Sequence, residues 1–311
     1  MYYPYFRGKQ FELITIRETA TLMAESHFVP IVEPVKEALG GLDRALKAVC
    51  DANGGAIVIV NPFHGEHSNN GAEISTLLQD GYAKNAAVEV GILLRDGMSI
   101  QQTVECCSQH NNHPLTLVHA GFTQAKALSA ALVEAHISCR NVFFEDYCGK
   151  LYRKHFSSGN RILLRDGFQR RRNKDHPPVE AFSDLHATYE EEGMTGFGDF
   201  LIVGDDFSES GGPAYAVAIH LTFIDSDQDD AMFIHHFVST SQDTPTDPAG
   251  KFAEALEKLV AELDSGNSKI IETSAVQEFR ALHNAGHFPG LGSVKKLSMK
   301  HHIETLAEYF S

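Results

Sequence analysis

Eight short runs of apolar, often β-branched residues alternate with helix-length segments over the first 205 residues. This alternation limits the fold more than any other feature, because continuous apolar runs are typical of strands covered on both faces, as in parallel sheets. Strands and helices in alternation predict a parallel α/β fold with right-handed crossovers. The runs are Phe11–Ile16, Phe28–Val32, Ala56–Val60, Val88–Leu94, Leu115–Val118, Asn141–Phe144, Arg161–Leu164 and Phe200–Val203.

Eight strands favour a closed (β/α)8 barrel of the TIM type over an open, doubly wound sheet. We therefore predict a barrel over residues 1–205. The helices predicted between its strands include Val35–Asn53, Gly71–Lys84, Ser99–His110, Thr123–Ala135 and Pro178–Glu192.

The pattern changes after residue 205. Two strand-like runs, Tyr215–Ile224 and Met232–Ser239, flank an acidic turn and predict a β-hairpin. Apolar residues at helical spacing then predict helices at Ala249–Leu263, Gln277–Asn284 and Lys300–Phe310. We interpret residues 206–311 as a C-terminal extension that packs on the barrel within the same domain.

The composition excludes several classes of protein. The 311 residues are 43% hydrophobic and 22% charged, which suits a globular chain with a large core. No apolar run is long enough to span a membrane, and residues 1–12 lack the apolar stretch of a signal peptide. Five cysteines without a C-x-x-C spacing argue against a disulfide framework and favour a reduced, cytoplasmic location. The net charge of −15 opposes broad, nonspecific binding to nucleic acid.

Polar side chains follow the predicted strands again and again. The carboxyl ends of barrel strands lie on one face, where barrel enzymes assemble their active sites. Such residues can equally be structural, since strands end where the chain reaches solvent. On position alone, the candidate catalytic residues are Glu33, Asn61, His119 and Asp146, and the candidate anion anchors are Arg17 and Arg165.

Two further segments are candidates for binding. The basic segment Gln169–Lys174 follows the seventh run, and its Arg170, Arg171 and Arg172 predict either an anion-binding loop or simply a solvated one. His64 and His67 have a spacing that weakly indicates a metal site, although the segment is not helical. No cofactor is otherwise indicated, and a divalent metal stays an open alternative.

Several stretches resemble an uncharacterised bacterial family that is similar to the phage-associated "beta protein" group. They are YYPYFRGKQFELITIRE, IVEP, GFGDFLIVGDDF, GGPAYAVAIHLTF and the closing FPGLGSVKKLSMKHHIETLAEYF. The resemblance implies a barrel-like fold and a gene in mobile or defence-type islands, beside a gene for a smaller companion protein. It carries no catalytic residues to transfer.

Two functions remain open on this basis. The first is a subunit of a two-gene anti-phage or toxin–antitoxin-like system that acts by binding its companion. The second is a barrel hydrolase or transferase for a nucleotide or other phosphorylated small molecule, with or without a metal. An enzyme needs Glu33, His119, Asp146 and an arginine to meet in one pocket, so their placement distinguishes the two.

Overall fold

The computed structural model describes residues 1–209, 212 and 214–311, which fall into two compact units. The barrel unit comprises Met1–Arg165 and Thr188–Asp199, and the second unit comprises Asp166–Ala187 and Phe200–Ser311. The chain thus leaves the barrel unit after residue 165 and returns to it for residues 188–199. This division differs from the single boundary at residue 205 that the sequence suggested.

The barrel unit contains a parallel sheet that is nearly closed into a barrel. Within the described residues its eight strands follow the order β1-β2-β3-β4-β5-β6-β7-β9. The backbone N–H of Tyr3 donates to Phe197 O over 2.8 Å, and that of Phe197 donates to Met1 O over 3.0 Å, so the two outer strands approach each other. The predicted parallel α/β, TIM-barrel-like architecture is confirmed at this level. The strands are β1 (Tyr5–Phe6), β2 (Ile31–Val32), β3 (Ala56–Ile59), β4 (Val88–Leu94), β5 (Leu115–His119), β6 (Arg140–Phe144), β7 (Arg161–Leu164) and β9 (Gly196–Gly198).

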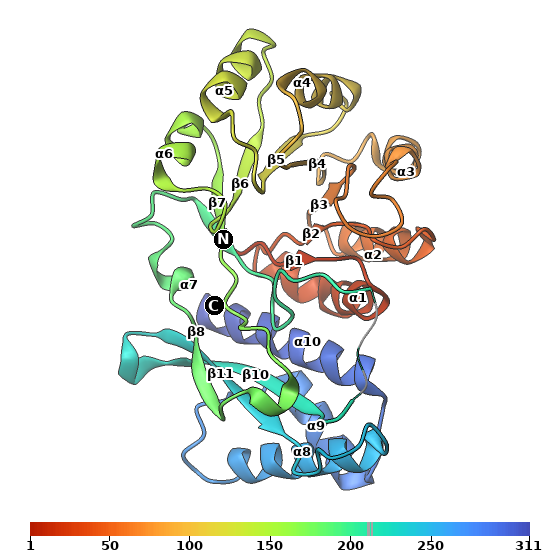
Figure 1. The fold of residues 1–311 in the computed structure, drawn as a ribbon, viewed down its shortest axis with the longest axis vertical. Helices are drawn as coiled ribbons and strands as arrows, with labels where there is room; N and C mark the ends of the chain where they lie inside the picture. Colours follow the sequence, from red (N-terminus) through yellow and green to blue (C-terminus); the bar gives the residue numbers. More distant parts are fainter. Residues whose placement is uncertain (210–211, 213) are drawn as a thin grey trace. The chain divides into compact units, whose positions relative to one another are not determined.

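Helices surround the strands on the outside of the barrel unit (Figure 1). Helix α4 begins with a capping box, in which the side chain of Ser99 accepts from the backbone of Gln102 and the side chain of Gln102 accepts in return. The helices predicted between the third and sixth strands are confirmed. The helices are α1 (Gln10–Glu25), α2 (Gly40–Asp51), α3 (Ala72–Tyr82), α4 (Ile100–Gln109), α5 (Ala125–Glu134), α6 (Lys150–Arg153) and the 3₁₀ turn η1 (Lys154–Phe156).

The inner strands are buried on both faces, which is why their sequences are apolar throughout. Ile57, Val58 and Ile59 follow one another in β3 and all have 0% exposure. Successive side chains of a strand point to opposite faces. One set therefore fills the barrel interior and the other packs under the helices.

The first and last predicted strands are wrong. Phe11–Ile16 lies in α1, where Leu13, Ile16, Ala20 and Met23 form one buried helical face. Phe200–Val203 forms turns, and Leu201 has a φ of 51°, which a strand does not accommodate. The flanking strands are instead the short β1 and β9.

The second unit contains a three-stranded antiparallel sheet in the order β10-β11-β8. The predicted hairpin is confirmed as β10 (Ala218–Asp225), the turn η3 (Ser226–Gln228) and β11 (Ala231–Val238). The helix predicted at Pro178–Glu192 is wrong, because part of this segment pairs with β11 as β8 (Val179–Ser183). The other elements are η2 (Asn173–Asp175), α7 (Leu185–Thr188), α8 (Pro248–Leu263), α9 (Ser274–Ala285) and α10 (Leu291–Tyr309).

One face of this sheet has its own core. Ile219, Leu221 and Phe237 pack with Phe252 of α8 and Phe279 of α9. The helices predicted at Ala249–Leu263, Gln277–Asn284 and Lys300–Phe310 are observed within α8, α9 and α10, and they pack on the hairpin, a contact that was not predicted. Among the described residues of the whole chain, no helix is long and apolar enough to cross a membrane.

The approach of β9 to the N-terminal residues depends on glycine. A Cβ on Gly198 would lie 2.1 Å from Tyr3 O and 2.3 Å from the Leu164 side chain. We expect Gly198→Ala to lower the free energy of unfolding by about 1–3 kcal/mol or more, because the strand must shift. Thermal and denaturant unfolding measure the effect.

Gly81→Ala is the matched control, since its Cβ would meet nothing within 4 Å in helix α3. It is expected to raise stability by about 0.5–1 kcal/mol through helix propensity. Equal stability of the two variants would contradict the role of glycine in closing the sheet.

Candidate functional site

The carboxyl ends of the parallel strands carry charged and polar residues. In a barrel these ends share one face, which we call the barrel mouth. Each residue comes directly or almost directly after its strand, so the strand fixes its backbone position. The set is Arg7, Glu33, Asn61, Arg95, Glu145, Arg165 and Asp199.

Glu33 is the centre of this face. Its side chain is fully buried, and its Oε1 accepts from the backbone N–H groups of Phe63, over 2.8 Å, and His64, over 3.0 Å. Its Oε2 accepts from the Tyr5 hydroxyl over 2.9 Å and from the Arg7 guanidinium. Both oxygens are therefore satisfied, as a buried carboxylate requires.

These contacts favour the ionised carboxylate. Burial raises the pKa of Glu33, but the charge of Arg7 and the hydrogen bonds from the His64 backbone and the Tyr5 hydroxyl lower it more. The pKa of the carboxyl therefore lies below its ordinary value. An ionised, fully bonded Glu33 is suited to positioning the loop that carries Phe63 and His64.

Positive charge gathers around His64. Burial and the charge of Arg7 lower the pKa of the His64 imidazole, and Glu33 opposes them only in part. Arg95 and Lys9 lower this pKa further. His64 is therefore neutral at pH 7.

Arg95 lies close to two exposed aromatic rings. Its Cζ is 3.8 Å from the ring centroid of Phe63 and 5.8 Å from that of Tyr147. Phe63 and Tyr147 are 50% and 48% exposed. Among the described residues, no carboxylate lies within ion-pairing distance of Arg95. An arginine that stacks on exposed rings without an acidic partner is available to an anionic ligand.

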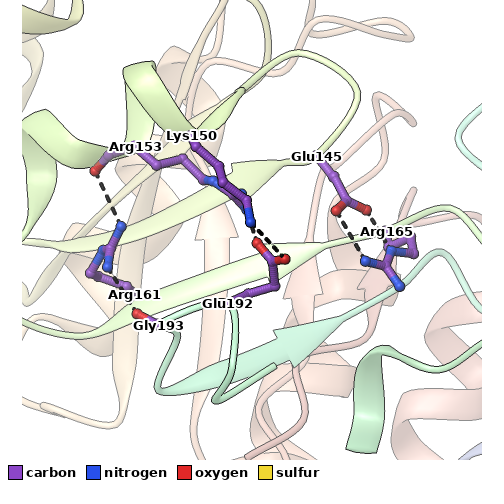
Figure 2. Close-up of polar contacts among 7 residues, drawn as sticks. All are labelled: Glu145, Lys150, Arg153, Arg161, Arg165, Glu192 and Gly193. Carbon is purple, nitrogen blue, oxygen red and sulfur yellow. Dashed lines mark hydrogen bonds and ion pairs between the residues drawn. The ribbon is translucent and has the colours of Figure 1, made fainter. Parts of the chain in front are cut away.

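The other strand-end candidates are engaged within the barrel unit. Arg165 makes a bidentate ion pair with Glu145, which Figure 2 shows. Its Nε donates to Oε2 over 2.5 Å and its Nη2 donates to Oε1 over 3.1 Å. The Asn61 side chain bonds both the N–H and the carbonyl of Leu93, at 2.8 and 2.9 Å. Asn61 thus extends the pairing of β3 with β4, which is a positioning role.

The structure does not bring His119 to the mouth. His119 lies in β5 with its ring in the outer layer, where it bonds Tyr152 over 2.7 Å and Asn141 over 3.0 Å. Burial lowers its pKa to about 4, although the Asn141 contact opposes this. Asp146 lies exposed in the turn after β6. The expected convergence of Glu33, His119 and Asp146 in one pocket is therefore not observed. An enzyme site built on these three residues is not supported, and a site at the barrel mouth would have to use other residues.

The predicted anion anchors outside the mouth have other surroundings. Arg17 lies on the exposed face of α1, because its segment is a helix. The three arginines after β7 belong to the second unit, and each has a carboxylate partner there. Arg170 is 3.6 Å from Asp206, Arg171 is 2.5 Å from Glu180 and Arg172 is 2.6 Å from Asp175.

A second polar cluster lies at the opposite end of β7 (Figure 2). Glu192 pairs with Lys150 at 3.3 Å and with Arg153 at 3.0 Å, while Arg161 donates to Gly193 O over 2.8 Å. These contacts attach the segment before β9 to α6. They stabilise the barrel unit rather than form a binding site.

His64 and His67, the predicted metal ligands, do not lie in a group of three or more potential ligands among the described residues. The Nε2 atom of His67 lies 3.1 Å from Lys36 O, and His64 lies beside Phe63. Within the described residues, three or more potential metal ligands come together only at His176, Glu180 and His236 of the second unit.

Sequence reasoning missed Arg7 and Lys9 and did not select Arg95. Arg7 directly follows the two-residue strand β1, which was not predicted. Arg95 follows the correctly predicted β4, so its position was a usable signal.

Comparisons with protein-family models, curated proteins and solved structures found no match.

The buried pair of Glu33 and Arg7 predicts a pH-dependent stability. Glu33→Gln removes the buried carboxylate that pairs with Arg7, and we expect a loss of about 3–5 kcal/mol at pH 7. Because the folded-state pKa of Glu33 lies below its ordinary 4.5, this contribution is present above pH 4.5 and is lost as the pH falls through the folded-state pKa. Urea unfolding between pH 7 and pH 3 measures it.

Glu66→Gln is the control, since Glu66 is an exposed glutamate near the same loop. Its effect on stability should be far smaller than that of Glu33→Gln, because ion pairs of exposed groups contribute little. A Glu33→Gln deficit that stays constant down to pH 3 would contradict the ionised pair.

Proposed function

We propose that the barrel unit is a (β/α)8-type enzyme whose mouth binds a phosphorylated small molecule, as a hydrolase or transferase. The observation that carries this proposal is Arg95, which has no acidic partner among the described residues and stacks on exposed Phe63. In a chain with a net charge of −15, such a cation at the mouth of a barrel is unusual. A guanidinium can donate two parallel hydrogen bonds to two oxygens of one phosphate.

The neighbouring groups suit the same ligand class. The charges of Arg95 and Lys9 act on His64, and positive charge at this place favours a phosphate over a neutral substrate. Phe63 and Tyr147 offer exposed ring faces on which a nucleobase can stack. A nucleotide would satisfy both features at once.

His64 is the proposed proton-transfer group. Its lowered pKa keeps the imidazole neutral at pH 7, where it can accept a proton from water or a substrate hydroxyl. Its backbone is fixed through the N–H bond to Glu33. Glu33 is then a positioning residue, because its oxygens are already occupied.

Calorimetry with adenosine monophosphate and inorganic phosphate tests this proposal. We expect Arg95→Met to weaken binding of both ligands about 10–100-fold, since charge-assisted contacts are lost. Phe63→Ala should weaken the nucleotide alone, because phosphate does not stack. Lys126→Met, at an exposed lysine of α5, is the control and should change neither affinity.

Release of phosphate from a panel of nucleotides and sugar phosphates measures turnover in the same proteins. His64→Gln should lower it about 10²–10⁴-fold. If neither ligand binds the native chain, or Arg95→Met binds as tightly, the anion site is wrong. If His64→Gln binds both ligands and turns over as the native chain does, the anion site stands but the role of His64 is refuted.

A companion protein is the second candidate, and one surface favours it. An open groove of about 550 Å³ lies between α4 and α5, with an apolar floor that includes Ile100, Val104 and Ala131. Glu105 and Glu134 line it as well. We propose that a basic, amphipathic segment of the companion occupies this groove, since its cations would pair with these acids.

Co-expression with the neighbouring gene product, followed by gel filtration, tests the groove. Val104→Arg should abolish co-elution, because it places a charge on the apolar floor. Val133→Arg is the control, since Val133 is 73% exposed on α5 but does not line the groove. Separate elution of the native proteins, or co-elution with Val104→Arg, would refute this surface.

A further inference from the structure

Three histidines and a glutamate meet on one face of the second unit's sheet. His220 of β10 lies directly opposite His236 of β11, and Glu180 of β8 pairs with Ile234, two residues before His236. Residues two apart in a strand share a face. His176, just after η2, completes the group from the segment that leads into β8.

The group is compact. The Nε2 atom of His236 lies 3.0 Å from Oε1 of Glu180, and the Nδ1 atom of His176 lies 3.7 Å from the same oxygen. One ligand atom from each of these three residues lies within 4.8 Å of the others. Zinc bonds of about 2.0–2.2 Å place tetrahedral ligand atoms roughly 3.3–3.5 Å apart. Small side-chain shifts would therefore bring the three atoms to bonding distance.

The imidazoles are buried, and one nitrogen has no hydrogen bond. The side chains of His176 and His236 are 1% and 0% exposed. The buried Nδ1 atom of His176 makes no hydrogen bond. A buried polar atom usually meets a protein group, an ordered water or an ion. Here the unpartnered nitrogen lies beside two other potential metal ligands. Phe168 packs against His176 and His220, at 5.5 and 5.2 Å between ring centroids.

We propose that His176, His236 and Glu180 bind a divalent transition metal ion of the zinc class. Two histidines and a carboxylate form a ligand set that zinc uses with water or substrate in the fourth position. His220 does not need to bind the metal. Its Nδ1 lies 2.7 Å from Nδ1 of His236, so it can hold the His236 ring with Nε2 directed at the ion.

Arg171 gives this site a competing cation. Its Nη1 donates to the same Glu180 oxygen over 2.5 Å, and its side chain is one-third exposed. Metal binding at Oε1 therefore requires the guanidinium to turn away from that atom. Removing the positive charge should favour the ion, because like charges repel across this short distance.

Titration of the chelator-treated chain with Co²⁺ and Zn²⁺ tests the site. We expect one ion per chain, tetrahedral-type Co²⁺ absorption and a metal-dependent rise in Tm. His176→Gln and His236→Gln should each lose this binding, and His220→Phe should weaken it about 10–100-fold. Arg171→Met should strengthen it several-fold, which a purely structural histidine cluster would not show.

His235→Gln is the matched control. His235 is the neighbour of His236 in β11, but its ring stacks on Phe237 at 4.0 Å, on the opposite face of the sheet from His236. It should bind the ion as the native chain does. Far-ultraviolet circular dichroism verifies that each variant is folded. The proposal is overturned if neither the native chain nor Arg171→Met binds the metal ion. It is also overturned if folded His236→Gln binds the ion as tightly as the native chain. The metal readout is independent of the function proposed for the barrel mouth.

Discussion

The barrel mouth depends on one buried carboxylate. Glu33 receives hydrogen bonds from Tyr5 of β1, from Arg7 directly after β1, and from two backbone N–H groups of the loop after β3. A buried charge is tolerated only while its partners are in place, so the ends of β1 and β2 and this loop are fixed together. The same contacts hold His64 where the charges of Arg7, Lys9 and Arg95 act on it. The chemistry proposed for the mouth therefore follows from the interaction that orders it.

The interior strands could be predicted from sequence because burial on both faces leaves a continuous apolar run, as in β3 and β4. The two flanking strands could not. Strand β1 is only two residues long, and β9 is Gly-Phe-Gly, whose glycines allow a close approach to Tyr3 rather than supply apolar surface. β8 was assigned to a helix because its only signal is pairing with β11, a tertiary contact that local sequence does not contain.

The candidate site was predicted in part for the same reasons. Glu33 and Arg95 could be found by their positions after correctly predicted strands, whereas Arg7 was hidden by the missed β1. His119 is the last residue of β5 rather than the one after it, and strand alternation turns its ring to the outer layer. His176, Glu180, His220 and His236 are spread over 61 sequence positions. Sheet register brings the last three together, and the segment before β8 adds His176.

The most direct test of the account is the pKa of His64, measured by NMR titration of its ring protons and assigned with His64→Gln. The account predicts a pKa below the ordinary value of 6.5 in the free protein, because burial and the charges of Arg7, Arg95 and Lys9 lower it more than Glu33 raises it. Saturating adenosine monophosphate should raise this pKa, since its phosphate offsets those charges. A His64 pKa that is ordinary in the free protein, or unchanged by the bound nucleotide, would contradict an anion site at the barrel mouth.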